Sequence, residues 1–458
     1  MSTQTTVEAL YGSVAPVADQ REAFTSGRIP VGVYGLGKMG LPLAAVYAET
    51  TGNVTGADVD PAVVECVNDG HSHVVGEPGL DALVGETVEA GALSAETDPA
   101  AVAEDARVHV VIVPTLVDDK TPDLSIVRSV AEDVGAGLDA GDLVVFESTL
   151  PPRSCRDELL PVLEAESGLE LGEFGLAFCP ERTHSGRALE DIRGAHPKVV
   201  GGADAESTRA AKLVYDELAD TDLVTVSDTT TAEAVKVFEG LYRDVNIALA
   251  NELATHADAL EIDVTEAIAA ANTQPFCDIH TPGAGVGGHC IPYYPYFLTD
   301  PFDVPTPLLE TARAVNDGMP TYTAELALTG LRDEGVDPAD ATVLVAGLTY
   351  RAGVAETRKT PALPIVERLA EAGATVLATD PILDDTSEFS VAGATVVDAP
   401  TDADPDAVVL VTAHEEFRDL DVPTLAGDGR LVLVDGRQAL TEYRGHESVR
   451  YEGVGLHD

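Results

Sequence analysis

With 458 residues, 45% of them hydrophobic, the chain is long enough for two or three separately packed domains. A net charge of -52, from 79 acidic and 27 basic residues, disfavours nucleic acid and anionic membranes as partners, because their phosphates are repelled. No apolar run approaches the roughly 20 residues that span a bilayer, so we expect no membrane segment.

The acidic residues are spread along the whole chain, and only six of the basic residues are lysine. Dispersed acid on a folded protein is tolerated where molar salt screens charges within ~3 Å, and this composition resembles that of cytoplasmic proteins from halophiles. Residues 1–28 lack the basic start and the apolar block of a signal peptide. The five cysteines fit neither a disulfide nor a metal framework, so we expect a cytoplasmic protein with no metal site.

A glycine-rich turn follows the first predicted strand, in "RIPVGVYGLGKMGLPLAAVYAE", and a helical pattern begins after it. This turn matches GxGxxG, and a second strand, "NVTGADVD", ends in Asp58, 18 residues after the last glycine. Asp58 would accept hydrogen bonds from the adenosine ribose and repel a 2′-phosphate, which favours NAD over NADP. The predicted cofactor contacts are Gly35, Leu36, Gly37, Lys38, Met39, Gly40 and Asp58. The alternative is a glycine turn that packs helix on strand without a ligand.

Three further predicted strands, at 107–115, 142–152 and 174–182, alternate with helices in the manner of a parallel, doubly wound sheet. The carboxyl ends of such strands form the ligand-binding edge. Thr115, Thr149 and Glu181 stand at or just after these ends and are candidates for the site. Each could instead cap the next helix.

The pattern changes at residue 229, where a stretch of 45 residues has helical spacing and predicts helix throughout. Lys236 stands out on this apolar segment. A partly buried lysine would stabilise developing negative charge, or its head would simply extend to solvent. The helical pattern resumes after residue 302 and predicts one long helix leading to another domain.

That last domain opens with a buried strand at 341–350 and repeats the alternation of strand and helix without a GxGxxG motif. Arg351, Arg358 and Lys359 gather in the loop after the strand, against the acidic trend of the chain. A nucleotide diphosphate is the simplest explanation for this grouping, and a structural ion-pair cluster is the alternative.

The stretch "TPGAGVGGHCIPYYPYFL", residues 281–298, places Cys290 directly after several glycines. Such glycines let a substrate or another backbone approach closely. Buried free cysteines are common and mostly inert, so this stretch alone leaves open whether Cys290 is a nucleophile or a packing residue.

The order of these motifs resembles the UDP-sugar 6-dehydrogenase family over residues 30–445. The likeness rests on "VYGLGKMGLPLA", "ESTLPP", "FCPER", "VKVFEGLYRDVNIALANELA", "GAGVGGHCIP", "ARAVNDGMP" and "GLTYRAGVAETRKTPAL". The resemblance implies an α/β fold in which a central helical domain joins two Rossmann-like domains with doubly wound parallel sheets. We expect an N-terminal extension at 1–28, an NAD-binding domain at 29–227, a central helical dimerisation and catalytic domain at 228–330, and a UDP-sugar-binding domain at 331–458.

The family also implies a homodimer that oxidises the C6 alcohol of a UDP-sugar to a carboxylate with two NAD. By resemblance, Cys290 is the nucleophile that forms a thiohemiacetal and a thioester, Lys236 stabilises the oxyanion, and Glu181 handles the proton of the hydrolytic water. Thr149 is a further water or nicotinamide-side contact, and Thr115 is placed with the cofactor contacts. The predicted substrate contacts are Arg182, Asn246, Gly285, Gly287, Gly288, His289, Arg351 and Arg358.

Two positions depart from the family. Where an asparagine commonly follows the lysine by four residues this chain has Gly240, and where an aspartate commonly follows the cysteine by four residues it has Tyr294. In the family both residues help to hold the lysine or the catalytic water. The substrate-loop arginine of the family has no counterpart in "NTQPFCDIHTPG".

The predicted function is therefore a UDP-N-acetylhexosamine 6-dehydrogenase, with UDP-N-acetylmannosamine or UDP-N-acetylglucosamine as substrate. His289, in "GGHC", resembles this branch of the family more than the glucose branch, where serine is usual. The alternatives are a UDP-glucose 6-dehydrogenase and, prompted by Gly240 and Tyr294, a catalytically silent UDP-sugar-binding protein.

Overall fold

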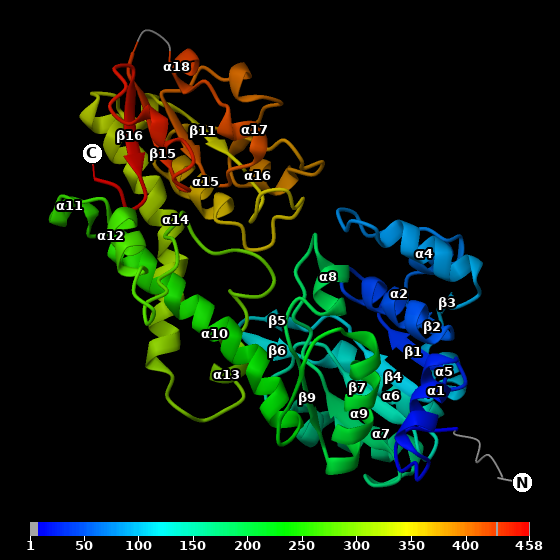
Figure 1. Ribbon diagram of the computed structural model, residues 1–458. Coiled ribbons are helices and arrows are strands. Elements are labelled where there is room, and N and C mark those ends of the chain that lie inside the picture. The colour runs from blue at the N-terminus through cyan, green and yellow to red at the C-terminus, as the bar shows by residue number, and fades with distance from the viewer. Residues whose placement is uncertain (1–7, 427–428, 458) are drawn as a thin grey trace, which may run out of the picture. The chain divides into compact units, whose positions relative to one another are not determined.

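The computed structural model describes residues 8–426 and 429–457, which form two compact units. Of these described residues, 8–238 and 296–302 belong to unit 1, and 239–295, 303–426 and 429–457 belong to unit 2 (Figure 1). Part of the predicted N-terminal extension, residues 1–7, lies outside the described residues. The predicted division into three domains stays a prediction.

Unit 1 contains an eight-stranded sheet in the order β10-β9-β8-β7-β4-β1-β2-β3. Its strands are β1 (Val31–Tyr34), β2 (Val54–Ala57), β3 (Leu93–Glu96), β4 (Val108–Val111), β7 (Leu143–Phe146), β8 (Gly175–Phe178), β9 (Lys198–Gly202) and β10 (Leu223–Thr225). All neighbouring strands are parallel except β8 and β9, which pair antiparallel. The predicted parallel, doubly wound arrangement is thus confirmed, with one antiparallel junction that the sequence pattern did not indicate.

The helices of unit 1 are mostly short. They are α1 (Val17–Thr25), α2 (Gly40–Thr51), α3 (Pro61–Asn68), α4 (Leu80–Glu89), α5 (Pro99–Asp105), α6 (Ser125–Gly137), α7 (Leu160–Ser167), α8 (Ala188–Arg193) and α9 (Ala205–Leu218), with a π-helix at Cys155–Leu159 before α7. A hairpin of β5 (Leu116–Asp118) and β6 (Thr121–Asp123) follows β4, and α13 (Tyr296–Thr299) packs beside it.

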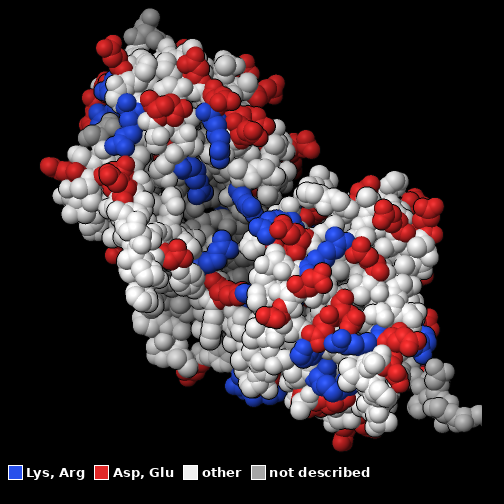
Figure 2. All heavy atoms as spheres, viewed as in Figure 1, with Lys and Arg blue, Asp and Glu red and all other residues white. Residues whose placement is uncertain are grey.

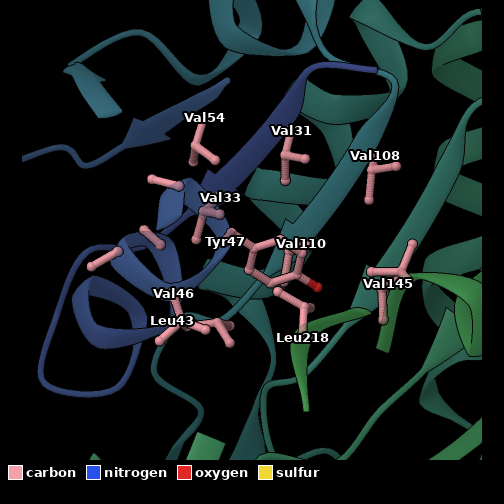
Figure 3. Close-up of a cluster of buried hydrophobic side chains, with 14 of the residues drawn as sticks. Val31, Val33, Leu43, Val46, Tyr47, Val54, Val108, Val110, Val145 and Leu218 are labelled. Atoms are coloured by element: carbon pink, nitrogen blue, oxygen red, sulfur yellow. The ribbon is translucent and has the colours of Figure 1, made fainter. Parts of the chain in front are cut away.

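Alternate residues of the central strands face two different cores, which is why helices cover both faces of the sheet. Val31 and Val33 of β1 belong to one core, and Tyr34 belongs to the other. Figure 3 shows the first core, where side chains of the strands, of α2 and of α9 meet; the labelled residues are Val31, Val33, Leu43, Val46, Tyr47, Val54, Val108, Val110, Val145 and Leu218. Burying each such side chain contributes about 1.5–3 kcal/mol.

Unit 2 contains a six-stranded, all-parallel sheet in the order β13-β12-β11-β14-β15-β16. Its strands are β11 (Thr342–Ala346), β12 (Thr375–Thr379), β13 (Ala394–Val396), β14 (Ala407–Leu410), β15 (Leu431–Asp435) and β16 (Val449–Gly453). Val343 and Val345 face one core while Leu344 and Ala346 face another, so this sheet is also covered on both sides. The second predicted Rossmann-like sheet is confirmed.

The helices of unit 2 include a long one, α14 (Pro307–Asp333), as the sequence predicts. The others are α11 (Ala257–Leu260), α12 (Val264–Ala271), α15 (Ala362–Glu371), α16 (Ser387–Val391), α17 (Glu415–Arg418) and α18 (Val422–Leu425), with 3-10 turns at Pro338–Asp340, Pro400–Asp402 and Thr441–Tyr443. Helix α10 (Thr229–Ala254) begins in unit 1 and ends in unit 2.

The prediction of one continuous helix over residues 229–273 is wrong: α10 ends at Ala254, and α11 and α12 follow as separate helices. Glu261 adopts a left-handed backbone conformation with φ 54, which ends α11. The Asp263 side chain then accepts hydrogen bonds from Thr265 N and Glu266 N and caps a new helix, α12. Apolar spacing alone did not reveal this break.

Acidic side chains are widespread on the face of the molecule that Figure 2 draws. Figure 2 shows Asp and Glu side chains scattered over the visible face of both units, with fewer Lys and Arg among them. No helix within the described residues is both long enough and apolar enough to cross a bilayer.

Candidate active site

The glycine turn between β1 and α2 has the geometry of a phosphate cradle. Gly35 has φ 94, and a Cβ there would stand 2.4 Å from Ile112 O. A Cβ at Gly40 would stand 1.9 Å from Gly35 O, so the fold itself requires these two glycines. A Cβ at Gly37 would meet nothing within 4 Å. The open space at Gly37, at the start of a helix, is what a pyrophosphate needs.

Asp58 follows β2 and lies beside the glycine turn. Its Oδ2 accepts a hydrogen bond from Leu36 N at 2.8 Å, and its Oδ1 accepts one from Asp60 N at 3.0 Å. Leu36 is fully buried, whereas Lys38 is exposed and Met39 is half-buried. The predicted cofactor residues at 35–40 and Asp58 are therefore neighbours in unit 1, and they fit an NAD adenosine and pyrophosphate.

The loops after β4 and β7 are linked to each other. Thr115 Oγ1 donates to Thr149 O at 2.7 Å, and Ser148 Oγ bonds both the amide (2.8 Å) and the carbonyl (2.9 Å) of Val113. Ile112, which touches Gly35, precedes the same loop. Thr115 and Thr149 thus lie together at the carboxyl edge of the sheet, where parallel sheets bind ligands.

Glu181 and Lys236 form an ion pair with Oε2 and Nζ 3.7 Å apart, and their side chains are only 17% and 11% exposed. Glu181 also accepts hydrogen bonds from the amide and hydroxyl of Thr183. Burial acts to raise the pKa of Glu181, but Lys236, the Thr183 hydrogen bonds and Lys198 together hold it below its usual value. The carboxylate is therefore kept ionised and is suited to accept a proton.

The Glu181 turn is also joined to the cofactor loop, because Thr183 Oγ1 lies 3.0 Å from Met39 Sδ. Sequence patterns did not single out Thr183. The only sequence feature that could have identified Thr183 was its hydroxyl, two residues after Glu181, the carboxylate predicted at the end of a strand.

Cys290 lies in unit 2, on an exposed turn. The glycines before it are explained by close protein neighbours: a Cβ at Gly285 would stand 2.9 Å from Pro361, one at Gly287 2.6 Å from Lys359 O, and one at Gly288 2.9 Å from the Tyr350 ring. These glycines therefore let the loop lie against the segment that follows β11. Because the Cys290 thiol is exposed, it does not fit the alternative that this cysteine is a buried packing residue.

Two of the predicted substrate residues contact the same carboxylate in that segment. His289 pairs with Glu356, and Arg358 Nε lies 3.7 Å from Glu356 Oε1. Gly288 N also donates to Arg358 O at 2.9 Å. Arg358 thus has a carboxylate partner within the protein, and its predicted substrate contact stays a prediction.

Arg351 lines a cavity of about 540 Å³ at the carboxyl edge of the second sheet. Its lining residues come from the loops after β11, β14 and β15 and from the end of α17; they are Tyr350, Arg351, Ala352, Thr412, Ala413, Arg418, Arg437, Gln438 and Ala439. Among residues 8–426 and 429–457, none of the three arginines in this set has an ion-pair partner. Unpaired guanidinium groups in a chain with net charge -52 indicate an anion site.

Arg437 is the most enclosed of these arginines. Its Nε donates to Val411 O at 2.8 Å, and a Cβ at Gly283 would stand 2.7 Å from its Nη1. Burial lowers the pKa of its guanidinium. Sequence reasoning missed Arg437 and Arg418; the signal for Arg437 was its position two residues beyond the apolar run "LVLVD".

A buried polar network supports the loop that carries Arg351. His414 Nε2 lies 3.2 Å from Asp380 Oδ2 and 2.8 Å from Thr349 Oγ1. Asp380 also accepts from Leu348 N at 2.7 Å. Burial acts to raise the pKa of Asp380, but His414 and the backbone donors lower it, so the carboxylate that holds this loop stays ionised.

Arg182 and Asn246 are occupied by protein partners. Arg182 Nη1 donates to Pro197 O at 2.8 Å. Asn246 Nδ2 donates to Asp278 O at 2.6 Å, and its Oδ1 accepts from His280 N at 2.8 Å. Their predicted substrate contacts stay predictions.

A dinucleotide cradle, a second Rossmann-like sheet with an anion cavity and an exposed cysteine together define a nucleotide-dependent oxidoreductase. Three domains of the UDP-glucose/GDP-mannose dehydrogenase family match this sequence: the NAD binding domain at residues 29–219, the central domain at 230–318 and the UDP binding domain at 344–442. The chain belongs to this family and is an NAD-dependent dehydrogenase.

Individual relatives resemble the chain over nearly its whole length. The UDP-N-acetyl-D-mannosamine dehydrogenase of Pyrococcus horikoshii is 34% identical, with 90% of this chain and 96% of that protein aligned. An NDP-N-acetyl-D-galactosaminuronic acid dehydrogenase of Ralstonia solanacearum is 35% identical over 89% of this chain and 95% of its own.

Solved structures agree in fold. The UDP-D-ManNAc dehydrogenase structure from Pyrococcus horikoshii has a TM-score of 0.86 and 32% identity, covering 94% of this chain and 100% of its own. A UDP-glucose dehydrogenase from Pyrobaculum islandicum has a TM-score of 0.82 and 26% identity, covering 93% of this chain and 98% of its own.

Proposed function

We propose that the protein oxidises the C6 alcohol of a UDP-N-acetylhexosamine, UDP-N-acetylmannosamine or UDP-N-acetylglucosamine, to the carboxylate. The observation that carries this proposal is the cavity of about 540 Å³ with three unpaired arginines, which suits a nucleoside diphosphate. The hexosamine is favoured by the names of the relatives and by His289, which follows the glycines directly.

The residues would act in sequence. Bound NAD supplies a hydride acceptor in each oxidation. The alcohol loses a hydride and a proton to become an aldehyde, and the Cys290 thiolate adds to it to form a thiohemiacetal. Loss of a second hydride and proton gives a thioester, which water cleaves to release the carboxylate and the thiol. Lys236 would stabilise the oxyanions, and Glu181 would accept the proton of the attacking water.

The other site residues would bind and orient. Gly35, Gly37 and Gly40 would receive the NAD pyrophosphate, and Asp58 the adenosine ribose. Arg351, Arg418 and Arg437 would hold the UDP diphosphate. The predicted roles of Thr115, Thr149, Arg182, Asn246, His289 and Arg358 belong to this same proposal.

The test is NADH formation against a panel of UDP-sugars in molar KCl. We expect about two NADH per sugar with a UDP-N-acetylhexosamine and little with UDP-glucose. Preference for UDP-glucose would support the alternative substrate. Tight UDP-sugar binding without NADH from any sugar would support a silent binding protein.

We expect Arg437→Ala to raise the KM for the UDP-sugar by roughly 10- to 100-fold, because a charge-assisted contact to the diphosphate is lost. The KM for NAD should stay unchanged. Arg430→Ala is the matched control in the same unit, since Arg430 is 40% exposed and pairs with Glu334 at 3.1 Å. Equal effects of the two variants on UDP affinity would contradict the assignment of the cavity.

We also infer a homodimer. Phe238, Tyr242 and Leu249 on α10 are 55%, 53% and 48% exposed, and their spacing places them on one face of the helix. A second copy would bury this apolar stripe. Light scattering in molar salt should give twice the chain mass, and Leu249→Asp should give a monomer; a wild-type monomer would contradict the inference.

We propose a cytoplasmic, halophilic enzyme of polysaccharide biosynthesis. The scattered acidic side chains support a requirement for high salt. The five free cysteines support a reducing, cytoplasmic compartment. Activity should fall when KCl is lowered to about 0.1 M, where screening extends over roughly 10 Å. Full activity and an unchanged melting temperature at that salt concentration would contradict the halophilic assignment. Recovery of the protein in a membrane fraction would contradict the cytoplasmic assignment.

A further inference from the structure

The Tyr294 ring lies directly against Gly240 of α10. A Cβ at Gly240 would stand 1.8 Å from Cδ2, 2.8 Å from Cγ and 2.9 Å from Cε2 of that ring. Only glycine leaves room for the ring in this position. Tyr294 is 8% exposed, and Gly240 is buried. Gly240 and Tyr294, the two positions noted above as unlike the family pattern, are therefore in contact with each other.

Tyr294 is also bonded to the residue proposed as the nucleophile. Its backbone N–H donates to Cys290 O at 3.0 Å, and Tyr293 N donates to the same oxygen at 3.0 Å. The turn that begins at Cys290 is thus closed by Tyr294, and the ring of Tyr294 anchors that turn on α10. On the other side of Cys290, Gly288 N is held by Arg358 O.

We propose that Tyr294 is a positioning residue, whose ring, seated in the space left by Gly240, fixes the turn that carries Cys290. The proposal rests on the proposed function, in which Cys290 is the nucleophile. Along α10, Gly240 follows Lys236 by four residues, about one helical turn. The Tyr294 ring therefore packs on the same helix that carries the lysine proposed to stabilise the oxyanion.

A methyl group added at residue 240, where the Tyr294 ring packs, tests the proposal. Gly240→Ala should displace the ring and move Cys290, and a misplacement of about 1 Å lowers kcat by roughly 100-fold. The KM values for NAD and UDP-sugar should stay near wild type. The alkylation rate of Cys290 by iodoacetamide, followed by mass spectrometry, should change, while that of half-buried Cys66 in unit 1 should not.

Gly318→Ala is the matched control. Gly318 is a helical glycine of the same unit, in α14, and a Cβ there meets nothing within 4 Å. This variant should keep wild-type kcat and alkylation, and its melting temperature should be equal or higher because alanine favours a helix over glycine.

A double-mutant cycle separates ring packing from other effects. Tyr294→Ala should lower kcat and change the Cys290 alkylation rate, and adding Gly240→Ala to it should do no further harm, because the ring is gone. Tyr294→Phe, which keeps the ring, should retain most of the wild-type kcat. This rescue by phenylalanine is not expected if Tyr294 acts through its hydroxyl.

Wild-type kcat and Cys290 alkylation in Gly240→Ala would overturn the proposal, and so would additive losses in the double variant. Should Gly240→Ala fail to fold, Tyr294→Ala decides: unchanged alkylation of Cys290 there overturns the proposal, and a changed rate supports it. The alkylation assay needs no turnover. A wild-type protein that forms no NADH with any UDP-sugar would therefore contradict the proposed function separately.

Discussion

Replacing Cys290 with serine is expected to abolish steady-state formation of the carboxylate product while leaving NAD and UDP-sugar binding near wild type. A thiolate is a far better nucleophile at neutral pH than a hydroxyl, and a thioester is hydrolysed far more readily than an oxygen ester. Because Cys290 is exposed, the substitution removes no core packing, and the melting temperature should hold.

Three measurements on the Cys290→Ser variant check this result: NADH formation, ligand affinity and the intact mass of the protein. A slow oxygen ester would add the mass of the substrate acyl group. Cys277→Ser is the control, since Cys277 is half-buried with its Sγ 3.3 Å from Asn272 Oδ1. Near-normal turnover with two NADH per sugar would remove Cys290 from the mechanism.

Lys236→Met is expected to lower kcat by roughly 100- to 1,000-fold, because the charge proposed to stabilise the oxyanion is lost. It should also shift the pH profile. Burial acts to raise the pKa of Glu181, and Lys236 is the leading influence that lowers it. Without the lysine the pKa of Glu181 rises, so the carboxylate is lost at a higher pH and the acid limb of the profile moves upward.

The pH dependence of kcat/KM across the acid limb provides the measurement. Lys212→Met is the control, because Lys212 forms a half-buried ion pair with Asp216 at 2.7 Å in the same unit, away from Glu181. Thr183→Val, which removes one of the hydrogen bonds to Glu181, should move the limb in the same direction while keeping the lysine. If kcat falls but the acid limb does not move, the prediction that Lys236 lowers the pKa of Glu181 is contradicted.

The sequence predicted the parts of the fold that local patterns determine. Short valine-rich runs such as Val31–Tyr34 are buried on both sides, and glycines 35 and 40 are required by contacts as close as 1.9 Å. Glu181, at a strand end, and Lys236, on a helix, were each singled out from separate motifs, and it is the structure that pairs them.

The remaining features depend on contacts between distant segments. Nothing in the composition of β9 (Lys198–Gly202) shows that it runs antiparallel to β8, because both are buried apolar strands. Arg418 and Arg437 line the same cavity as Arg351 only because the segments after three parallel strands converge on one edge of a sheet. The break near Asp263 was within reach of sequence reasoning, since "DVTE" is a helix-capping pattern.

The contact of Tyr294 with Gly240 also restricts the order in which such a pair can arise in evolution. While residue 240 carries a Cβ, the tyrosine ring cannot take the place that it has here, because the two would stand 1.8 Å apart. Glycine at 240, by contrast, makes no such clash with a smaller residue at 294. A lineage can therefore acquire glycine at 240 first and tyrosine at 294 second. As long as the tyrosine stays in this position, a larger residue at 240 would clash with its ring.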